Sequence, residues 1–215
     1  MSDYAAQRFN MVESQVRAND VTDQRIQKAM LDVPRERFVP ARLRPVAYMD
    51  GPLEVARGRF LLDARSFAKL AQLAAIRPGD VVLDVGAASG YSAAVLARIA
   101  ARVVALEEDA ELVRIASEAL RGIGNVELAQ GRLAEGHKPR GPYDVIFAGG
   151  AVETRPEALL RQLKESGRLV TVVREGGRGQ ARLYLNTGGA ISERIAFDSQ
   201  AQVLPGFEKA RSFVF

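Results

Sequence analysis

The residues best placed to do chemistry form one stretch, VVLDVGAASGY, which runs from Val81 to Tyr91. A short apolar run carries a single acid, Asp84, and ends at two glycines, Gly86 and Gly90, which bracket three small residues. This order is typical of a buried strand, a tight turn and the start of a helix, and glycine lets a ligand approach the backbone of such a turn closely. The function of the chain therefore depends on what this turn binds.

Three classes of ligand use a strand, a glycine turn and a helix. A nucleoside triphosphate loop places Lys and then Ser or Thr after its last glycine, whereas Tyr91 and Ser92 follow here. A dinucleotide fold needs the spacing Gly-x-Gly-x-x-Gly, which this turn lacks. The remaining spacing is typical of S-adenosylmethionine-dependent methyltransferases, so we expect S-adenosyl-L-methionine as the cofactor. The residues expected to hold it are Asp84, Gly86, Ala87, Ala88, Ser89, Gly90 and Tyr91.

A second acidic position supports nucleoside binding. Glu107 and Glu108 end the next apolar run, about twenty residues further on, where a carboxylate can accept hydrogen bonds from both ribose hydroxyls. Glu107 fits this role best because it is the first acid after the run. The alternative is that both acids only favour the N-terminus of the following helix.

The acceptor side carries little catalytic machinery. The chain has no cysteine, and Ala148-Gly149-Gly150-Ala151 stands where amino-group methyltransferases carry Asn/Asp-Pro-Pro-Tyr. No acidic pair with metal-ligand spacing follows that run, so no metal is expected. His137, the single histidine, lies in a polar loop. A carboxylate acceptor suits such a site because it is already ionised at neutral pH and needs no general base.

The rest of the chain predicts the elements that position these residues. Helical patterns cover residues 4–19, a segment after Asp20 or Thr22 up to Pro34, and residues 63–76. From Val81 strands alternate with helices at 81–85, 102–106, 126–129, 143–148 and 168–173, and Thr187-Gly188-Gly189-Ala190 then joins a hairpin of 181–186 and 191–197. We expect an α/β, Rossmann-like methyltransferase sheet, mostly parallel, with a C-terminal antiparallel hairpin and a helical N-terminal cap.

Composition and charge limit the possible partners and location. The formal net charge is +4, and the basic residues are scattered without a run of five, which favours a solvated surface over a nucleic-acid interface. No apolar run reaches the length of about 18 residues that a membrane span needs, and no signal pattern opens the chain. A cytoplasmic protein is expected, and the sequence gives no oligomeric state.

Several motifs along the chain together resemble those of the protein-L-isoaspartate (D-aspartate) O-methyltransferases. Besides the glycine turn, they are MVESQVR at 11–17, VPRERFVP at 33–40, AYMDGPL at 47–53 and PEALLRQLKESGRLV at 156–170. The resemblance implies an S-adenosylmethionine-dependent O-methyltransferase that places a methyl ester on the free carboxylate of an isoaspartyl residue in a protein or peptide. Such a reaction starts the repair of damaged protein.

The chain departs from this family at three places. The family's Gln-Thr-Ile-Ser falls on Arg59-Phe60-Leu61-Leu62, so both hydroxyls are lost and no catalytic serine can be carried over. The family's Gly-Asp-Gly, whose acid faces the adenine, falls on Gly131-Arg132-Leu133, and its Thr-Ala-Ala falls on Ala148-Gly149-Gly150. Arg132 and Leu133 are therefore the candidates at the adenine.

The acceptor-site candidates are Arg59, Leu62 and Ser66. Ser66 would resupply a hydroxyl if it shared a helix face with Leu62, or it is a surface or cap residue. Arg59 would pair with a substrate carboxylate, or it is a solvated loop residue.

Two alternatives to isoaspartyl methylation stay open. The chain could bind the cofactor without isoaspartyl activity, as a sensor or interaction module, or it could methylate another, smaller acceptor. We expect one domain over residues 1–215, made of a helical cap (1–80), a methyltransferase core (81–199) and a docked C-terminal tail (200–215).

Overall fold

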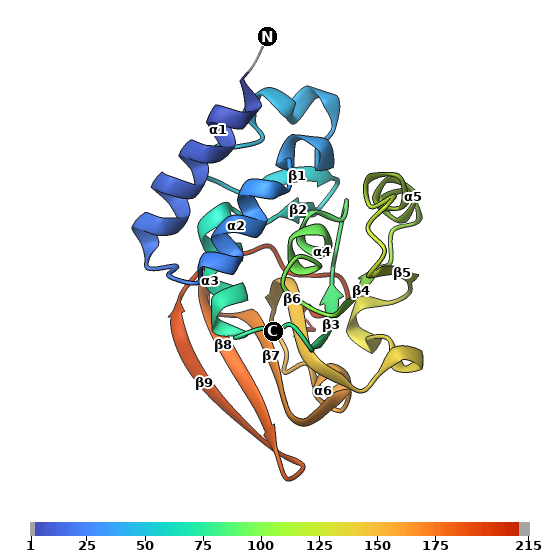
Figure 1. Ribbon diagram of the computed structural model, residues 1–215. Coiled ribbons are helices and arrows are strands. Elements are labelled where there is room, and N and C mark those ends of the chain that lie inside the picture. The colour runs from blue at the N-terminus through green and yellow to red at the C-terminus, as the bar shows by residue number, and fades with distance from the viewer. Residues whose placement is uncertain (1–2, 211–215) are drawn as a thin grey trace, which may run out of the picture.

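The computed structural model describes residues 3–210, and a seven-stranded sheet forms its centre (Figure 1). The strand order is β5-β4-β3-β6-β7-β8-β9, and β1 and β2 pair separately. The strands of the large sheet are β3 (Val81–Val85), β4 (Arg102–Glu107), β5 (Val126–Gln130), β6 (Tyr143–Val152), β7 (Leu163–Glu175), β8 (Arg178–Thr187) and β9 (Ala190–Asp198). In this order, each strand from β5 to β7 is parallel to its neighbours, as the alternation of strands and helices predicts. β8 is antiparallel to β7, and β9 is antiparallel to β8.

The register of the parallel strands brings the predicted site residues to one edge. Val85 lies opposite both Leu106 of β4 and Ala148 of β6. The turn after β3, the end of β4 at Glu107 and the glycines of β6 therefore meet at the carboxyl ends of adjacent strands, where open α/β sheets bind ligands.

Helices and loops cover both faces of the sheet. One face packs against the N-terminal helices together with α4 and α5, and the other packs against α6 and the C-terminal segment. The helices are α1 (Tyr4–Met11), η1 (Val12–Val16), η2 (Arg17–Asn19), α2 (Gln24–Asp32), η3 (Arg35–Phe38), η4 (Ala41–Val46), α3 (Ala64–Leu73), α4 (Tyr91–Leu96), α5 (Ala110–Ala119), η5 (Leu133–Glu135), η6 (Lys138–Arg140) and α6 (Glu157–Leu160). Figure 1 shows α1, α2 and α3 grouped together, with the long β8–β9 hairpin extending below them in that view.

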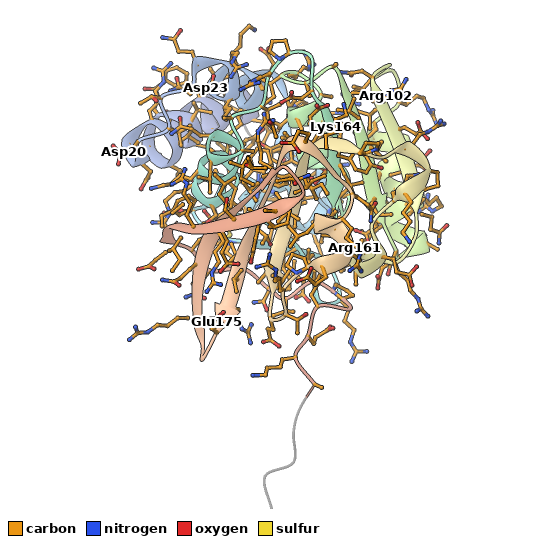
Figure 2. The ribbon with its side chains drawn as sticks, turned by 90° about the horizontal axis from the view of Figure 1, so that it is seen from below. Asp20, Asp23, Arg102, Arg161, Lys164 and Glu175 are labelled. Atoms are coloured by element: carbon orange, nitrogen blue, oxygen red, sulfur yellow. The ribbon has the colours of Figure 1, made fainter. Side chains whose placement is uncertain are left out.

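Two local predictions in the N-terminal part are wrong. The cap of α2 is Asp23, whose carboxylate accepts a hydrogen bond from Arg25 N, and neither Asp20 nor Thr22 caps it. Asp20 instead has a left-handed backbone (φ +62°) that reverses the chain after η2. Figure 2 shows Asp20 and Asp23 near the periphery of the molecule. The segment between the second and third predicted helices, where no strand was expected, contains β1 (Leu53–Ala56), which pairs with β2 (Arg59–Leu61).

The predicted tail docks through its first half. Ala151 of β6 exchanges two backbone hydrogen bonds of 2.8 Å with Gln202 and Leu204. Leu204 and Phe207 are buried in the core on that side of the sheet. Phe213 and Phe215, which were also expected to dock, lie outside the described residues. That residues 1–215 form one domain, made of a cap, a core and a tail, stays a prediction.

Within residues 3–210, none of the helices has the length and apolar character that crossing a membrane requires.

Candidate functional site

The glycine turn after β3 has the backbone conformation that its sequence predicts. Gly86 (φ +79°) and Gly90 (φ +96°) both adopt positive φ, and Ala88 between them does so at φ +49°. The N–H groups of Gly86 and Ala87 donate to Leu106 O at 2.9 and 3.1 Å, which ties the turn to the end of β4. Gly90 then caps α4, where a β-carbon would lie only 3.0 Å from Leu120.

Glu107 lies directly beneath this turn, with a fully buried side chain. Its Oε2 accepts hydrogen bonds from Ala88 N (2.8 Å) and from Arg59 Nη2 (2.5 Å). Its Oε1 accepts from the N–H groups of Glu108 and Asp109, at 2.9 and 3.1 Å. The carboxylate predicted to receive a ribose thus stands at the expected place, and four donors already hold it.

Of the two roles predicted for Arg59, that of a solvated loop residue is wrong, and pairing with a substrate carboxylate stays a prediction. Arg59 lies in β2, its side chain is 7% exposed, and it forms an ion pair with Glu107 across the sheet edge. Its Nε is also buried and finds no hydrogen-bond partner within residues 3–210. The tertiary structure therefore places the first residue of the divergent segment on the predicted ribose acid.

Asp84 is fully buried at the end of β3, where Ser92 Oγ donates a 2.6 Å hydrogen bond to its Oδ2. Its Oδ1 has no partner in the described part of the chain. Burial raises the pKa of Asp84 to about 7; the Ser92 hydrogen bond opposes this shift, and the negative charge of Glu107 adds to it. The acid that opens the turn is thus a poorly compensated carboxyl group inside the protein.

Ser89 and Tyr91 face the N-terminal part of the chain. The hydroxyl of Ser89 donates to Phe38 O at 2.5 Å, and the ring of Tyr91 packs against Phe38 and Phe67, with centroid separations of 5.7 and 5.9 Å. Both side chains therefore join the turn to the VPRERFVP segment.

Arg35 is the residue whose importance the sequence did not reveal. It is buried, its Nε donates to Ala47 O (3.0 Å) and its Nη2 donates to Leu62 O (2.7 Å). Its guanidinium also lies 4.7 Å from the ring centroid of Tyr91, within the range of a cation–π contact. One side chain thus connects the N-terminal segment, the divergent segment and the helix after the turn. Its position in the VPRERFVP motif was the feature of the sequence that could have identified it.

A cavity of about 410 Å³ opens beside the turn, and it is the candidate acceptor site. Leu62 and Ser66, both predicted for this site, line it, together with Arg59, Arg65 and the backbone of Gly149 and Gly150. Leu62 precedes the N-cap of α3, so it does not share a helix face with Ser66. Ser66 is buried rather than on the surface, and its hydroxyl accepts a hydrogen bond from Ser199 at 3.1 Å.

The remaining predicted residues lie away from this cavity. Glu108 accepts a hydrogen bond from Leu133 N at 3.2 Å, and the side chain of Leu133 is buried in the core. The side chain of Arg132 is 82% exposed and pairs with Glu135 at 3.5 Å. The structure therefore brings Leu133 and Glu108 together, but it turns Arg132 toward solvent.

The glycine turn and the buried carboxylate of Glu107 are residue types that suit an adenosine cofactor, but the space above the turn is filled. The hollow that Gly86, Ala87, Phe60 and Leu62 line holds only about 20 Å³, whereas ligand pockets enclose roughly 300–1,000 Å³. A β-carbon on Gly86 would lie 2.8 Å from Leu204 Cδ2 and 3.4 Å from Arg59 Nη2. Two side chains therefore occupy the place where a cofactor over the turn would lie.

Comparison with known proteins gives one consistent family. A model of the family described as protein-L-isoaspartate(D-aspartate) O-methyltransferase matches residues 6–197. A protein-L-isoaspartate O-methyltransferase of Methylorubrum extorquens is 43% identical over 188 residues, which are 87% of this chain and 82% of that protein. One of Koribacter versatilis is 38% identical over 175 residues, 80% of this chain and 79% of that protein.

Solved structures agree with these relatives. A protein-L-isoaspartate O-methyltransferase superposes with a TM-score of 0.82 at 26% identity, covering 93% of this chain and 66% of that one. A Plasmodium falciparum protein described as such an enzyme, in complex with S-adenosyl-L-homocysteine, gives a TM-score of 0.80 at 21% identity over 95% of this chain and 99% of that one. The second comparison shows the shared fold alone.

Proposed function

Because the chain belongs to the protein-L-isoaspartate(D-aspartate) O-methyltransferase family, we propose that it is an S-adenosylmethionine-dependent methyltransferase that esterifies a carboxylate of a protein or peptide. The family predicted from the sequence motifs is confirmed, and so are the sheet topology and the class of enzyme. S-adenosyl-L-methionine, when bound, supplies an electrophilic methyl group on a sulfonium.

The observation that carries this proposal is the meeting of three elements at one sheet edge. The turn from Gly86 to Gly90, the buried acid Glu107 and the cavity beside Gly149 all lie at the carboxyl ends of β3, β4 and β6. A donor over the turn and an acceptor in the cavity would be neighbours, and holding two reactants side by side supplies much of the catalysis when no proton has to be removed.

The lining of the acceptor cavity contains both basic and acidic side chains. Arg59, Arg65 and Arg174 contribute cationic side chains, while Asp50 and Asp63 contribute acids. The carboxylate of Asp63 is engaged as the N-cap of α3, where it accepts from Ser66 N at 2.7 Å. Arg59 is paired with Glu107 and Arg174 with Glu153 (3.4 Å), whereas Arg65 forms no ion pair within residues 3–210. Arg65 is therefore the candidate to hold an anionic acceptor such as a carboxylate.

A second candidate function is favoured by Phe60 and Leu62. Leu62 is only 7% exposed and lines both the cavity and the hollow over the turn, so an apolar group stands where the family resemblance places a serine. We therefore expect weak isoaspartyl methylation, with either another acceptor or a cofactor-binding role as the alternative.

A radiolabelled methyl-transfer assay tests these functions. The protein is incubated with labelled S-adenosyl-L-methionine and an isoaspartyl peptide or a cell extract, and base-labile label diagnoses a methyl ester. Leu62→Ser is expected to raise the rate on the isoaspartyl peptide, because it returns a hydroxyl to the cavity. Leu62→Ala is the matched control, since it removes the same bulk without adding the hydroxyl.

The outcomes separate the candidates. A rise with Leu62→Ser alone supports a diverged carboxyl methyltransferase, whereas equal rises with both variants mean that space and not the hydroxyl was limiting. Base-labile label on an extract component but not on the peptide identifies another acceptor. An absence of transfer by every variant to every acceptor contradicts the enzymatic proposal.

A further inference from the structure

Two side chains from distant parts of the chain close over the cofactor turn. Arg59 comes from β2, and Leu204 comes from the C-terminal segment that follows β9. A β-carbon on Gly150 of β6 would lie 2.7 Å from Leu204, and one on Gly86 would lie 2.8 Å from it. Leu204 is thus wedged between the two glycine-containing segments, with Arg59 beside it.

The Glu107 carboxylate has no acceptor position to spare in this arrangement. Three of its four donors are backbone N–H groups, those of Ala88, Glu108 and Asp109, which the turn and the strand end fix in place. The fourth donor is the guanidinium of Arg59, the one donor on a flexible side chain. A ribose can reach Glu107 only where Arg59 now stands.

The cavity beside Arg59 also has room for its side chain. Arg59 lines the cavity of about 410 Å³ as well as contacting Glu107, and its buried Nε has no partner within the described residues. A change of side-chain torsions alone can carry a guanidinium from a buried carboxylate into an adjacent hollow of this size. The Arg59–Glu107 ion pair can therefore separate without a rearrangement of the sheet.

We propose that Arg59 is a latch on the cofactor site: its ion pair with Glu107, covered by Leu204, closes the nucleoside position, and S-adenosyl-L-methionine binds only when Arg59 withdraws into the neighbouring cavity. This inference rests on the proposed function. It makes Arg59 a competitor of the cofactor rather than a ligand to it, and the energy needed to separate the buried pair is subtracted from the binding energy.

Calorimetry with S-adenosyl-L-homocysteine on the full chain tests the latch. Arg59→Gln can still donate one hydrogen bond to Glu107 but carries no charge, so we expect at least tenfold tighter binding than in the unmodified protein. Arg57→Gln is the matched control, since it removes an exposed arginine from the turn of the same β1–β2 hairpin, outside the cavity lining, and should leave the affinity unchanged. Arg59→Lys keeps the charge and should bind nearly as weakly as the unmodified protein.

A second measurement keeps the test valid if Arg59→Gln does not fold. In protein labelled with ¹⁵N-arginine, the Arg59 Nε–H signal, assigned by its loss in Arg59→Lys, should move on saturation with S-adenosyl-L-homocysteine. Its exchange with water should also accelerate, because the guanidinium leaves a closed site for an open cavity.

Failure of the latch and failure of the proposed function give different results. Equal or weaker binding by Arg59→Gln, or an Arg59 signal that ligand binding leaves unchanged, overturns the latch while leaving cofactor binding intact. If neither the unmodified protein nor Arg59→Gln, Arg59→Lys or Arg57→Gln binds the ligand when folded, both the latch and the methyltransferase proposal fall.

Discussion

Asp84 gives the most quantitative prediction about this protein. We expect Asp84→Asn to stabilise the fold above neutral pH, because it replaces a buried carboxylate by a neutral group of the same shape. The side chain is fully buried, and only the Ser92 hydroxyl donates to it among the residues described. Ionisation of this group is therefore poorly compensated.

The size and sign of the effect follow from the pKa of Asp84. Burial, reinforced by the charge of Glu107, raises this pKa from 3.8 to about 7, against the opposing Ser92 hydrogen bond. The folded state thus binds this proton more tightly than the unfolded state. Its contribution to stability is complete below pH 4 and is lost as the pH rises to about 7. A shift of roughly three units corresponds to about 4 kcal/mol.

Urea unfolding between pH 4 and pH 8.5 measures this contribution. The free energy of unfolding of Asp84→Asn should match that of the unmodified protein near pH 4 and exceed it by up to about 4 kcal/mol above pH 8. Asp50→Asn, at an exposed position, controls for the change in net charge and should leave the pH profile unchanged. A stability gap that does not widen with pH would refute the reasoning that Asp84 is protonated in the folded protein.

Two further substitutions test the supports of the site. Arg35→Ala should lower the free energy of unfolding by about 3 kcal/mol, since two buried backbone carbonyls lose their donor, whereas the exposed Arg37→Ala should have little effect in the same urea titration. Gly90→Ala (φ +96°) should cost more than Gly122→Ala (φ +87°) in thermal unfolding, because both pay about 1–2 kcal/mol for the backbone but only Gly90 is also crowded, by Leu120 at 3.0 Å. Equal losses for the two glycines would mean that Leu120 moves aside freely.

Local patterns were sufficient for the order of the elements and for the cofactor turn. Apolar runs separated by helical segments predict parallel strands, and the two glycines after the first of these runs predict the tight turn at Gly86 and Gly90. Helix boundaries were less accurate, because caps such as Asp23 compete with neighbouring acids that look equivalent in the sequence. The hairpin of β1 and β2 was missed because both strands are short.

By itself, then, the sequence determined the family, the sheet, the turn and the acid beneath it, since each depends on residues close together along the chain or on a regular period. The tertiary structure alone decided what fills the site. Arg59 and Glu107 are 48 residues apart, and Leu204 is further still, so no local pattern links them. Only the strand register and the docked C-terminal segment bring a cation and an apolar side chain onto Gly86, which changes an apparently open cofactor turn into a closed one.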